Sequence, residues 1–321
     1  MTGPRERRDL SEGLPATLAG GHFPRNASAA GEPRAGPTAR SGGHPVQPMY
    51  APFAASLSSP AMDPLAGLDI AQVTADNPSP FTLRGTNTWL VGRDPCWVID
   101  PGPSLKTHLD RVLADAHDRG GIGGIALTHD HSDHSDAVAE LRAASGSPPV
   151  AAVRHPADVR LSDGDRFGPL TVVAAPGHAP DHVAFVAGRA CFTGDAVLGE
   201  GSVFVAPDPG ALRGYLAALD RLRGMDLQVL CPGHGPLVLD PAAKIGEYIA
   251  HRLDRERRLV QALADGLRTA DELLDRVWAD APSALRPAAG FTLAAHLDKL
   301  DEEGRLPDGV ERPQLSMYGQ V

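Results

Sequence analysis

Short apolar runs alternate with clusters of Gly, Pro and polar residues from about residue 68 onward. The runs "TWLVG", "CWVIDPG", "GIGGIAL", "LTVVAA", "ACF" and "LQVLC" are rich in Val, Ile, Leu and Phe, which is typical of short buried strands. The segment "SDAVAELRAA" predicts a helix with Ser135 or Asp136 as its N-cap. The segment "GALRGYLAALDRLRG" predicts a helix whose apolar face comprises Leu212, Tyr215, Leu216, Leu219 and Leu222. Together these segments predict an α/β chain.

The strand pattern stops after "PGHGPLVLD", and residues from about 241 to 306 have helical periodicity. Pro241 suits the start of a helix, Thr269 and Glu272 fit a capping box, and Gly304 suits the residue just after a helix end. Three predicted helices followed by "GRL" resemble a small helical or winged-helix module, which we expect over residues 241–321.

Residues 1–62 are dense in Pro, Gly, Ala, Ser and Arg and have no apolar periodicity, so we expect a disordered tail. Met49 and Met62 leave open a translation start further downstream. Residues 63–240 then form the strand-rich domain that precedes the helical module.

Composition narrows the class of protein. The chain has 321 residues, of which 42% are hydrophobic and 22% charged, so most of it should fold as an ordinary globular protein. Its formal net charge of −10 disfavours non-specific binding to nucleic acid. Three cysteines without a CxxC pair argue against a disulfide framework, and no apolar run has the length of a membrane span. Because an apolar signal segment is also absent, we expect a cytoplasmic protein.

Ligand-type side chains crowd into "LTHDHSDHSDAVAE", directly after an apolar run. In an extended loop, His129 and His131 face the same way and can converge on one ion. Asp133 and His134 follow where the chain turns into a helix, and they can face a second ion. Imidazole and carboxylate together suit zinc, and also iron or manganese.

Three further clusters supply ligand-type residues past later strands. His178 lies in "APGHA", Asp195 in "FTGD" and His234 in "CPGHG". A Gly beside each of them permits tight turns and close backbone approach. Because a strand end holds a side chain rigidly, these residues are candidates for the rest of a metal site.

The order HxHxDH, PGH, TGD and PGHG, from about Asn77 to Leu239, resembles the metallo-β-lactamase superfamily of hydrolases. The resemblance implies an αββα sandwich for the catalytic domain over residues 63–240, with a dinuclear metal site at one edge of the sheets. It implies that His129, His131 and His178 hold the first metal, that Asp133, His134 and His234 hold the second, and that Asp195 bridges them. It also implies that Asp100, in "VIDPG", supports the ligand loop from behind.

The same resemblance implies two Zn²⁺ per chain, with iron or manganese as alternatives, and attack by a hydroxide that bridges the metals. The candidate catalytic residues are Asp133, in the HxHxDH motif, and His182, in "APDHVAF". His182 is a candidate proton donor to the leaving group. A hydrogen-bonded structural role for this histidine is equally open.

Departures between subfamilies bear on the substrate. True zinc β-lactamases commonly use Cys at the position of Asp195, so we do not expect antibiotic cleavage. Flavodiiron oxygen reductases have Glu at the position of His131, which argues for hydrolysis over redox chemistry. The flanks "NPSPFTLRGTNTWLVG", "GEGSVFV" and "EYIAHRLDRE" resemble the β-lactamase-like protein 2 group, whose animal members are endonucleases of single-stranded RNA.

The first expected activity is therefore cleavage of an RNA phosphodiester, and the alternative is a glyoxalase-II-like thioesterase or carboxylic-ester hydrolase. A basic groove would favour single-stranded RNA as substrate, and a closed pocket would favour a small ester or thioester. A catalytically silent binding protein is a third reading of the same fold. No membrane partner is expected, and the chain is either a monomer or a homodimer.

Overall fold

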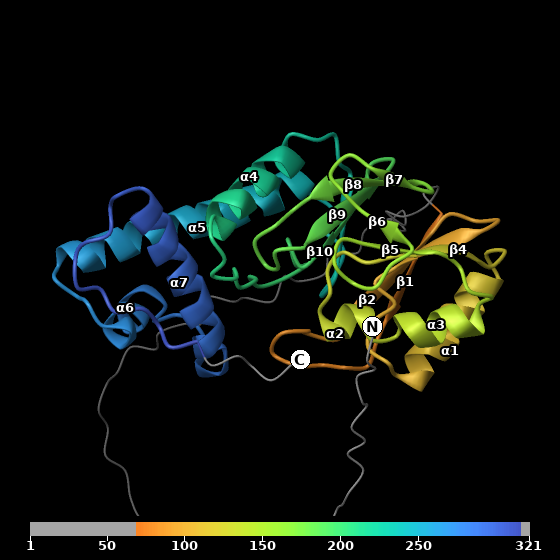
Figure 1. Ribbon diagram of the computed structural model, residues 1–321, viewed down its shortest axis with the longest axis horizontal. Helices are drawn as coiled ribbons and strands as arrows, with labels where there is room; N and C mark the ends of the chain where they lie inside the picture. The colour runs from red at the N-terminus through yellow and green to blue at the C-terminus, as the bar shows by residue number, and fades with distance from the viewer. Residues whose placement is uncertain (1–68, 316–321) are drawn as a thin grey trace, which may run out of the picture. The chain divides into compact units, whose positions relative to one another are not determined.

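The computed structural model describes residues 69–315, and the strands of this part form two mixed sheets (Figure 1). The tail expected over residues 1–62 lies outside the described residues. The first sheet has six strands in chain order, with antiparallel pairing from β1 to β3 and parallel pairing from β3 to β6. These strands are β1 (Ile70–Thr74), β2 (Asn87–Val91), β3 (Cys96–Ile99), β4 (Ile122–Ala126), β5 (Val150–Ala152) and β6 (Val159–Arg160).

The second sheet has five strands in the order β11-β10-β9-β8-β7. Strands β10 and β11 pair in parallel, and the other neighbours are antiparallel. The strands are β7 (Arg166–Phe167), β8 (Leu170–Ala174), β9 (Val183–Ala187), β10 (Ala190–Gly194) and β11 (Val229–Pro232).

Each sheet buries one face against the other sheet and the opposite face under helices. The shared core includes Trp89 and Ile99 from the first sheet and Phe185 and Phe192 from the second. Helices α1 (Lys106–His117) and α3 (Val138–Ala144) pack on the first sheet, and α4 (Ala211–Arg223) and α5 (Pro241–Ala264) pack on the second. The four layers confirm the predicted αββα sandwich.

Glycine explains one close contact between the two sheets. A Cβ on Gly124 of β4 would lie 2.5 Å from Cζ of Phe167. Only glycine at this strand position therefore lets the Phe167 ring approach the backbone of the facing sheet.

Beyond β11, the described residues form helices. They are α5, α6 (Ala270–Val277), a short 3₁₀ turn η1 (Ser283–Leu285) and α7 (Arg286–Glu302). The predicted capping box is confirmed, since Thr269 and Glu272 exchange side-chain and backbone hydrogen bonds at the start of α6. Gly304, with φ of 65°, follows Glu303, the C-cap of α7, and so occupies the predicted position just past the helix end. No helix among residues 69–315 is long and apolar enough to cross a membrane.

The predicted N-cap at Ser135 or Asp136 is wrong. The chain turns helical earlier, in the short helix α2 (Ser132–Ser135), because the His131 carbonyl accepts the backbone N–H groups of both His134 and Ser135. Helix α3 then begins after Ala137, with no side chain as its cap. The predicted apolar face of α4 is confirmed, because Leu216 is partly buried and the other four predicted residues are fully buried.

Candidate metal centre

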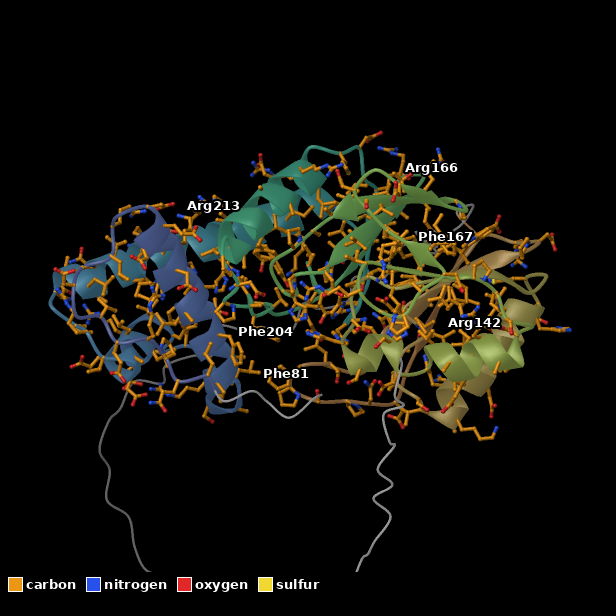
Figure 2. All side chains as sticks on the ribbon, viewed as in Figure 1. Phe81, Arg142, Arg166, Phe167, Phe204 and Arg213 are labelled. Carbon is orange, nitrogen blue, oxygen red and sulfur yellow. The ribbon has the colours of Figure 1, made fainter. Side chains whose placement is uncertain are left out.

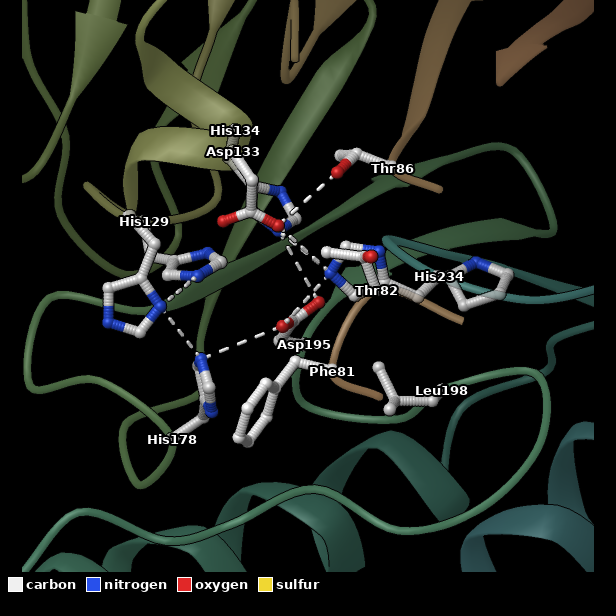
Figure 3. Close-up of polar contacts among 12 residues, drawn as sticks. Phe81, Thr82, Thr86, His129, Asp133, His134, His178, Asp195, Leu198 and His234 are labelled. Atoms are coloured by element: carbon white, nitrogen blue, oxygen red, sulfur yellow. Dashed lines mark hydrogen bonds and ion pairs between the residues drawn. The ribbon is translucent and has the colours of Figure 1, made fainter. Parts of the chain in front are cut away.

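The seven residues predicted as metal ligands lie together at one edge of the two sheets (Figure 3). Each one follows or ends a strand: the loop and helix α2 after β4, the turn between β8 and β9, the end of β10 and the end of β11. Three overlapping groups have ligand atoms within 4.8 Å of one another. They are His129, His131 and His178; Asp133, His134 and His234; and His129, His134 and Asp195.

In the first group, three imidazole nitrogens converge. Nε2 of His129 and Nε2 of His178 each lie 3.0 Å from Nδ1 of His131. Two donors on one tetrahedral zinc ion lie about 3.4 Å apart, given zinc–nitrogen bonds of about 2.1 Å. The spacing therefore fits three ligands of a single ion.

The second group combines two imidazoles with a carboxylate. Oδ2 of Asp133 lies 3.2 Å from Nε2 of His234 and 3.5 Å from Nε2 of His134. The two histidine nitrogens are 3.3 Å apart. This donor set also fits one ion, with a mixture of nitrogen and oxygen ligands.

Asp195 lies between the two groups. Its Oδ1 is 3.5 Å from Nε2 of His134, and its Oδ2 is 3.4 Å from Nε2 of His234 and 3.6 Å from Nε2 of His178. One carboxylate thus contacts histidines of both groups. Such a position suits a ligand that two ions share.

Asp100 fixes the tautomers behind two of the histidines. Because a carboxylate only accepts, Nδ1 of His134 donates to Oδ2 of Asp100 over 2.9 Å, which leaves the Nε2 lone pair free. The hydroxyl of Thr128 donates to the same oxygen over 2.7 Å. That hydroxyl therefore accepts from Nδ1 of His129 over 3.0 Å, which leaves Nε2 of His129 free as well. The support predicted for Asp100 is present.

Backbone carbonyls fix the tautomers of His178 and His234. Nδ1 of His178 donates to the Phe204 carbonyl, and Nδ1 of His234 donates to the Gly85 carbonyl, each over 3.3 Å. When both rings are neutral, the Nε2 lone pairs of His134 and His234 face each other over 3.3 Å. A cation between them makes this arrangement favourable, so the residues present fit bound metal ions.

The electrostatics of the cluster favour positive charge. Burial lowers the pKa of His234, but Asp195 and Asp133 outweigh it and raise that pKa to about 10. Burial also lowers the pKa of His134, but the carboxylates of Asp133, Asp195 and Asp100 outweigh it and raise that pKa to about 9. Burial raises the pKa of Asp133, but His134 and His234 lower it to about 2. The buried carboxylates therefore stay ionised and attract a cation.

Glycine beside the ligands allows their close approach, as the sequence predicts. A Cβ on Gly233 would lie 2.6 Å from Oδ1 of Asp195 and 2.8 Å from Cε1 of His134. The "PGH" turn therefore needs a residue without a side chain at this position.

His182 lies behind Asp195. Its Nε2 accepts the backbone N–H of Asp195 over 3.0 Å, and its buried Nδ1 has no hydrogen-bond partner among residues 69–315. The contact favours the structural alternative, in which the ring holds the backbone of Asp195. The catalytic role of His182 stays a prediction, as does that of Asp133.

Sequence reasoning missed several residues that orient the ligands. The Thr86 hydroxyl donates to Oδ2 of Asp133 over 3.2 Å, and Asn77 holds Thr86 through two hydrogen bonds. Nδ2 of Asn87 donates to the carbonyls of Pro232 and Gly235, on either side of His234. The polar run "RGTNT", which leads into β2, is a sequence signal for Thr86 and Asn87.

Aromatic side chains lie beside the cluster. The Phe204 ring packs on the His178 ring with centroids 4.5 Å apart, and it also contacts Phe291 of α7 at 6.0 Å. Phe81 lies beside the cluster in Figure 3, and Figure 2 shows where Phe81 and Phe204 come from in the fold. This side of the candidate centre is therefore apolar.

Comparisons with known proteins match both parts of the chain. Residues 147–234 match the Metallo-beta-lactamase superfamily, and residues 269–308 match the Beta-lactamase associated winged helix domain. The chain is 31% identical over 270 residues to the Beta-lactamase-like protein 2 homolog of Caenorhabditis elegans, covering 78% of this chain and 88% of that protein.

Two further relatives extend the comparison. Thioesterase pkgB of Emericella nidulans is 37% identical over 201 residues, which cover 59% of this chain and 57% of that protein. The crystal structure of a metallo-beta-lactamase family protein of Thermus thermophilus aligns with a TM-score of 0.60 at 24% identity. That alignment covers 74% of this chain and 94% of the other, and it shows a shared fold.

Proposed function

Since the chain belongs to the metallo-beta-lactamase superfamily of hydrolases, we propose that it is a two-metal-ion hydrolase of thioester or carboxylic-ester bonds. The observation that carries this proposal is the pair of ligand groups joined by Asp195. We further propose residues 63–240 as the catalytic domain and residues 241–321 as an accessory module.

We assign the first ion to His129, His131 and His178 and the second to Asp133, His134 and His234, with Asp195 shared. The nitrogen-rich donor set suits zinc, and iron or manganese suits it as well. When bound, such ions make hydroxide available near neutral pH and stabilise the negative oxygen that develops on an attacked carbonyl.

The protein's own residues orient the ligands. Asp100 and the carbonyls of Phe204 and Gly85 hold imidazole rings by Nδ1, so that Nε2 faces the centre. The Thr86 hydroxyl keeps Asp133 turned toward His234. These contacts place the ligands before substrate arrives, which is the preorganisation that electrostatic catalysis requires.

The surroundings support an uncharged acyl group as substrate. Among residues 69–315, the ion pairs of Asp133 and Asp195 are with histidines and not with Lys or Arg. Phe204 packs on His178, so an apolar acyl chain can lie against the centre. The relative named as a thioesterase supports the same substrate class.

A phosphodiester of single-stranded RNA is the second candidate, because the accessory module matches a winged helix domain. The charge of this module argues against RNA as substrate, since RNA binding requires Lys and Arg side chains that are free to contact phosphates. The basic side chains of the module are largely paired with acidic ones: Arg255 with Asp280, Arg257 and Arg258 with Asp254, Arg286 with Asp271, Arg305 with Glu256, and Arg312 with Asp298.

Metal analysis together with a substrate panel tests the proposal. The panel comprises S-lactoylglutathione, a long-chain acyl thioester, bis-p-nitrophenyl phosphate and a fluorescent RNA oligonucleotide. We expect two metals per chain and fastest turnover of a thioester, lost in His131→Ala and kept in His117→Ala, which alters an exposed histidine on α1. Activity that survives chelation, or fewer than one bound metal per chain, would refute the proposal. Faster turnover of RNA would select the second candidate.

A further inference from the structure

Residues 202–206, which lie between β10 and α4, contact the candidate ligand His178. The Phe204 carbonyl accepts its Nδ1 hydrogen, and the Phe204 ring packs on its imidazole. The backbone N–H of Ala206 donates over 2.8 Å to the carbonyl of Gly177, which directly precedes His178. The position of this segment therefore decides where the His178 ring lies.

Helices α5 and α7 hold the same segment from the other side. The Arg252 guanidinium donates to the Ser202 hydroxyl over 3.0 Å and to the Val203 carbonyl. The backbone N–H of Val205 donates to the Thr292 hydroxyl over 3.3 Å. Two side chains of the helical module thus fix the residues on both sides of Phe204.

Arg252 is an unusual residue to find in this position. It is 2% exposed and has no acidic partner among residues 69–315. Its guanidinium lies over the ring of Tyr215, 5.6 Å from the centroid, and its Nε has no hydrogen-bond partner among the same residues. A buried charge without a counter-ion is costly, and apolar residues fill most such positions. The structural role of Arg252 therefore lies in its hydrogen bonds to Ser202 and Val203.

The Thr292 hydroxyl is committed in a complementary way. It lies 3.3 Å from the Ala288 carbonyl, one turn earlier in α7, and donates its hydrogen there. The oxygen is then free to accept the backbone N–H of Val205. Only a hydroxyl at this position satisfies both groups.

We propose that Arg252 and Thr292 are positioning residues for His178. They hold the Phe204 carbonyl in place, which keeps the Nδ1–H tautomer of His178 and leaves its Nε2 free toward His131. The helical module contributes no predicted ligand and still tunes one of the two ligand groups. This inference rests on the proposed function, in which His178 is a metal ligand.

Titration of the metal-free protein with Co²⁺, together with competition for Zn²⁺ against a chelator, tests the inference. We expect Thr292→Val to weaken one of the two sites by about 10-fold, the usual effect of losing a contact behind a ligand, and to change the visible Co²⁺ spectrum. Thr292→Ser should restore both properties. Arg252→Lys, which keeps the charge but loses the planar fork, should give a similar loss at the same site.

Thr269→Val is the matched control, because the Thr269 hydroxyl also accepts a backbone N–H within the module but is not among the contacts of residues 202–206. We expect it to lower stability and leave both metal affinities unchanged. Unchanged affinity and spectrum in Thr292→Val and Arg252→Lys, or an equal loss in Thr269→Val, would overturn the inference.

A wild-type protein that binds no metal would instead overturn the proposed function. The imidazole tautomer of His178, measured by long-range ¹⁵N–¹H NMR on metal-free protein, then decides the inference alone. We expect the Nδ1–H form in the wild type and a loss of that form in Thr292→Val. The same tautomer in both proteins would count against it.

Discussion

Replacing Asp100 by Asn should weaken the hydrogen bonds behind the candidate ligands while every candidate ligand stays in place. Asp100 is 1% exposed and accepts three hydrogen bonds: from the Thr128 N–H over 2.8 Å, the Thr128 hydroxyl over 2.7 Å and Nδ1 of His134 over 2.9 Å. Its φ is 49°, in the left-handed region that Asn also adopts readily. The substitution therefore keeps the backbone and changes only one acceptor oxygen into an amide.

The magnitude follows from these contacts. If the amide oxygen faces the Thr128 N–H, the NH₂ group faces two donors, and both bonds to Oδ2 are lost. Bonds to a charged group contribute about 1.5–3 kcal/mol each. Because the hydroxyl and the imidazole can reorient, we expect a net loss of about 3 kcal/mol in the free energy of unfolding, or about 6–12 °C in Tm. A neutral His134 can satisfy the amide only by moving its proton to Nε2, so metal affinity should fall about 10- to 100-fold.

Urea denaturation of the metal-free protein and chelator competition for zinc measure the two effects. Asp69→Asn is the matched control, because Asp69 also has a positive φ, of 50°, but its carboxylate is exposed and, among residues 69–315, pairs with Arg93 alone, over 3.2 Å. We expect little change in that variant. If Asp100→Asn unfolds at the urea concentration of the wild type, or binds zinc as tightly, the account of tautomer control is wrong.

Three other predictions concern packing, protonation and metal removal. Gly233→Ala places a Cβ 2.6 Å from Asp195, so its metal content by mass spectrometry should drop below that of Gly246→Ala, whose new Cβ meets open space on α5. Burial and the nearby charge of Arg252 lower the pKa of His296 to about 3. The unfolded chain gains this proton near pH 6.5 and the folded chain only near pH 3. The stability that the neutral His296 ring contributes is therefore intact above about pH 6.5 and is lost as pH falls toward 3, by on the order of 5 kcal/mol. His296→Leu should flatten that part of the pH dependence of unfolding, and an unchanged slope would contradict the assignment. Removal of metal with a chelator should lower Tm and abolish hydrolysis, and added zinc should restore both; a Tm that does not respond would argue against bound metal.

The candidate ligands could be predicted because their positions depend on local structure. His129 and His131 are two residues apart in an extended loop, and a single helical turn then presents Asp133 and His134. The later ligands follow buried strands whose apolar runs are visible in the sequence. The strand ends therefore supply candidate ligands, and their assignment to two ions follows from the resemblance to the metallo-β-lactamase superfamily.

The groups that orient the ligands could not be predicted, because they depend on contacts between distant segments. Thr86 lies 47 positions before Asp133 in the chain, and Phe204 lies 26 positions after His178. The Phe204 contact is through a backbone carbonyl, which has no residue signature at all. Short strands such as β6 and β7, with two residues each, are likewise set by their partners and not by a periodic pattern.

The same distinction separates reaction from substrate. The ligand motifs specify the atoms that meet the reacting bond, and they recur in enzymes that cut different bonds. We expect selection of the substrate to depend on the aromatic residues beside the candidate centre. Phe204 packs on His178 and contacts Phe291 of the helical module, and Phe81 lies beside the cluster in Figure 3. Because the module also holds residues 202–206, a change in α7 can alter both the apolar wall and the orientation of His178. We therefore expect the helical module to influence which bond is cut, although it supplies none of the candidate ligands.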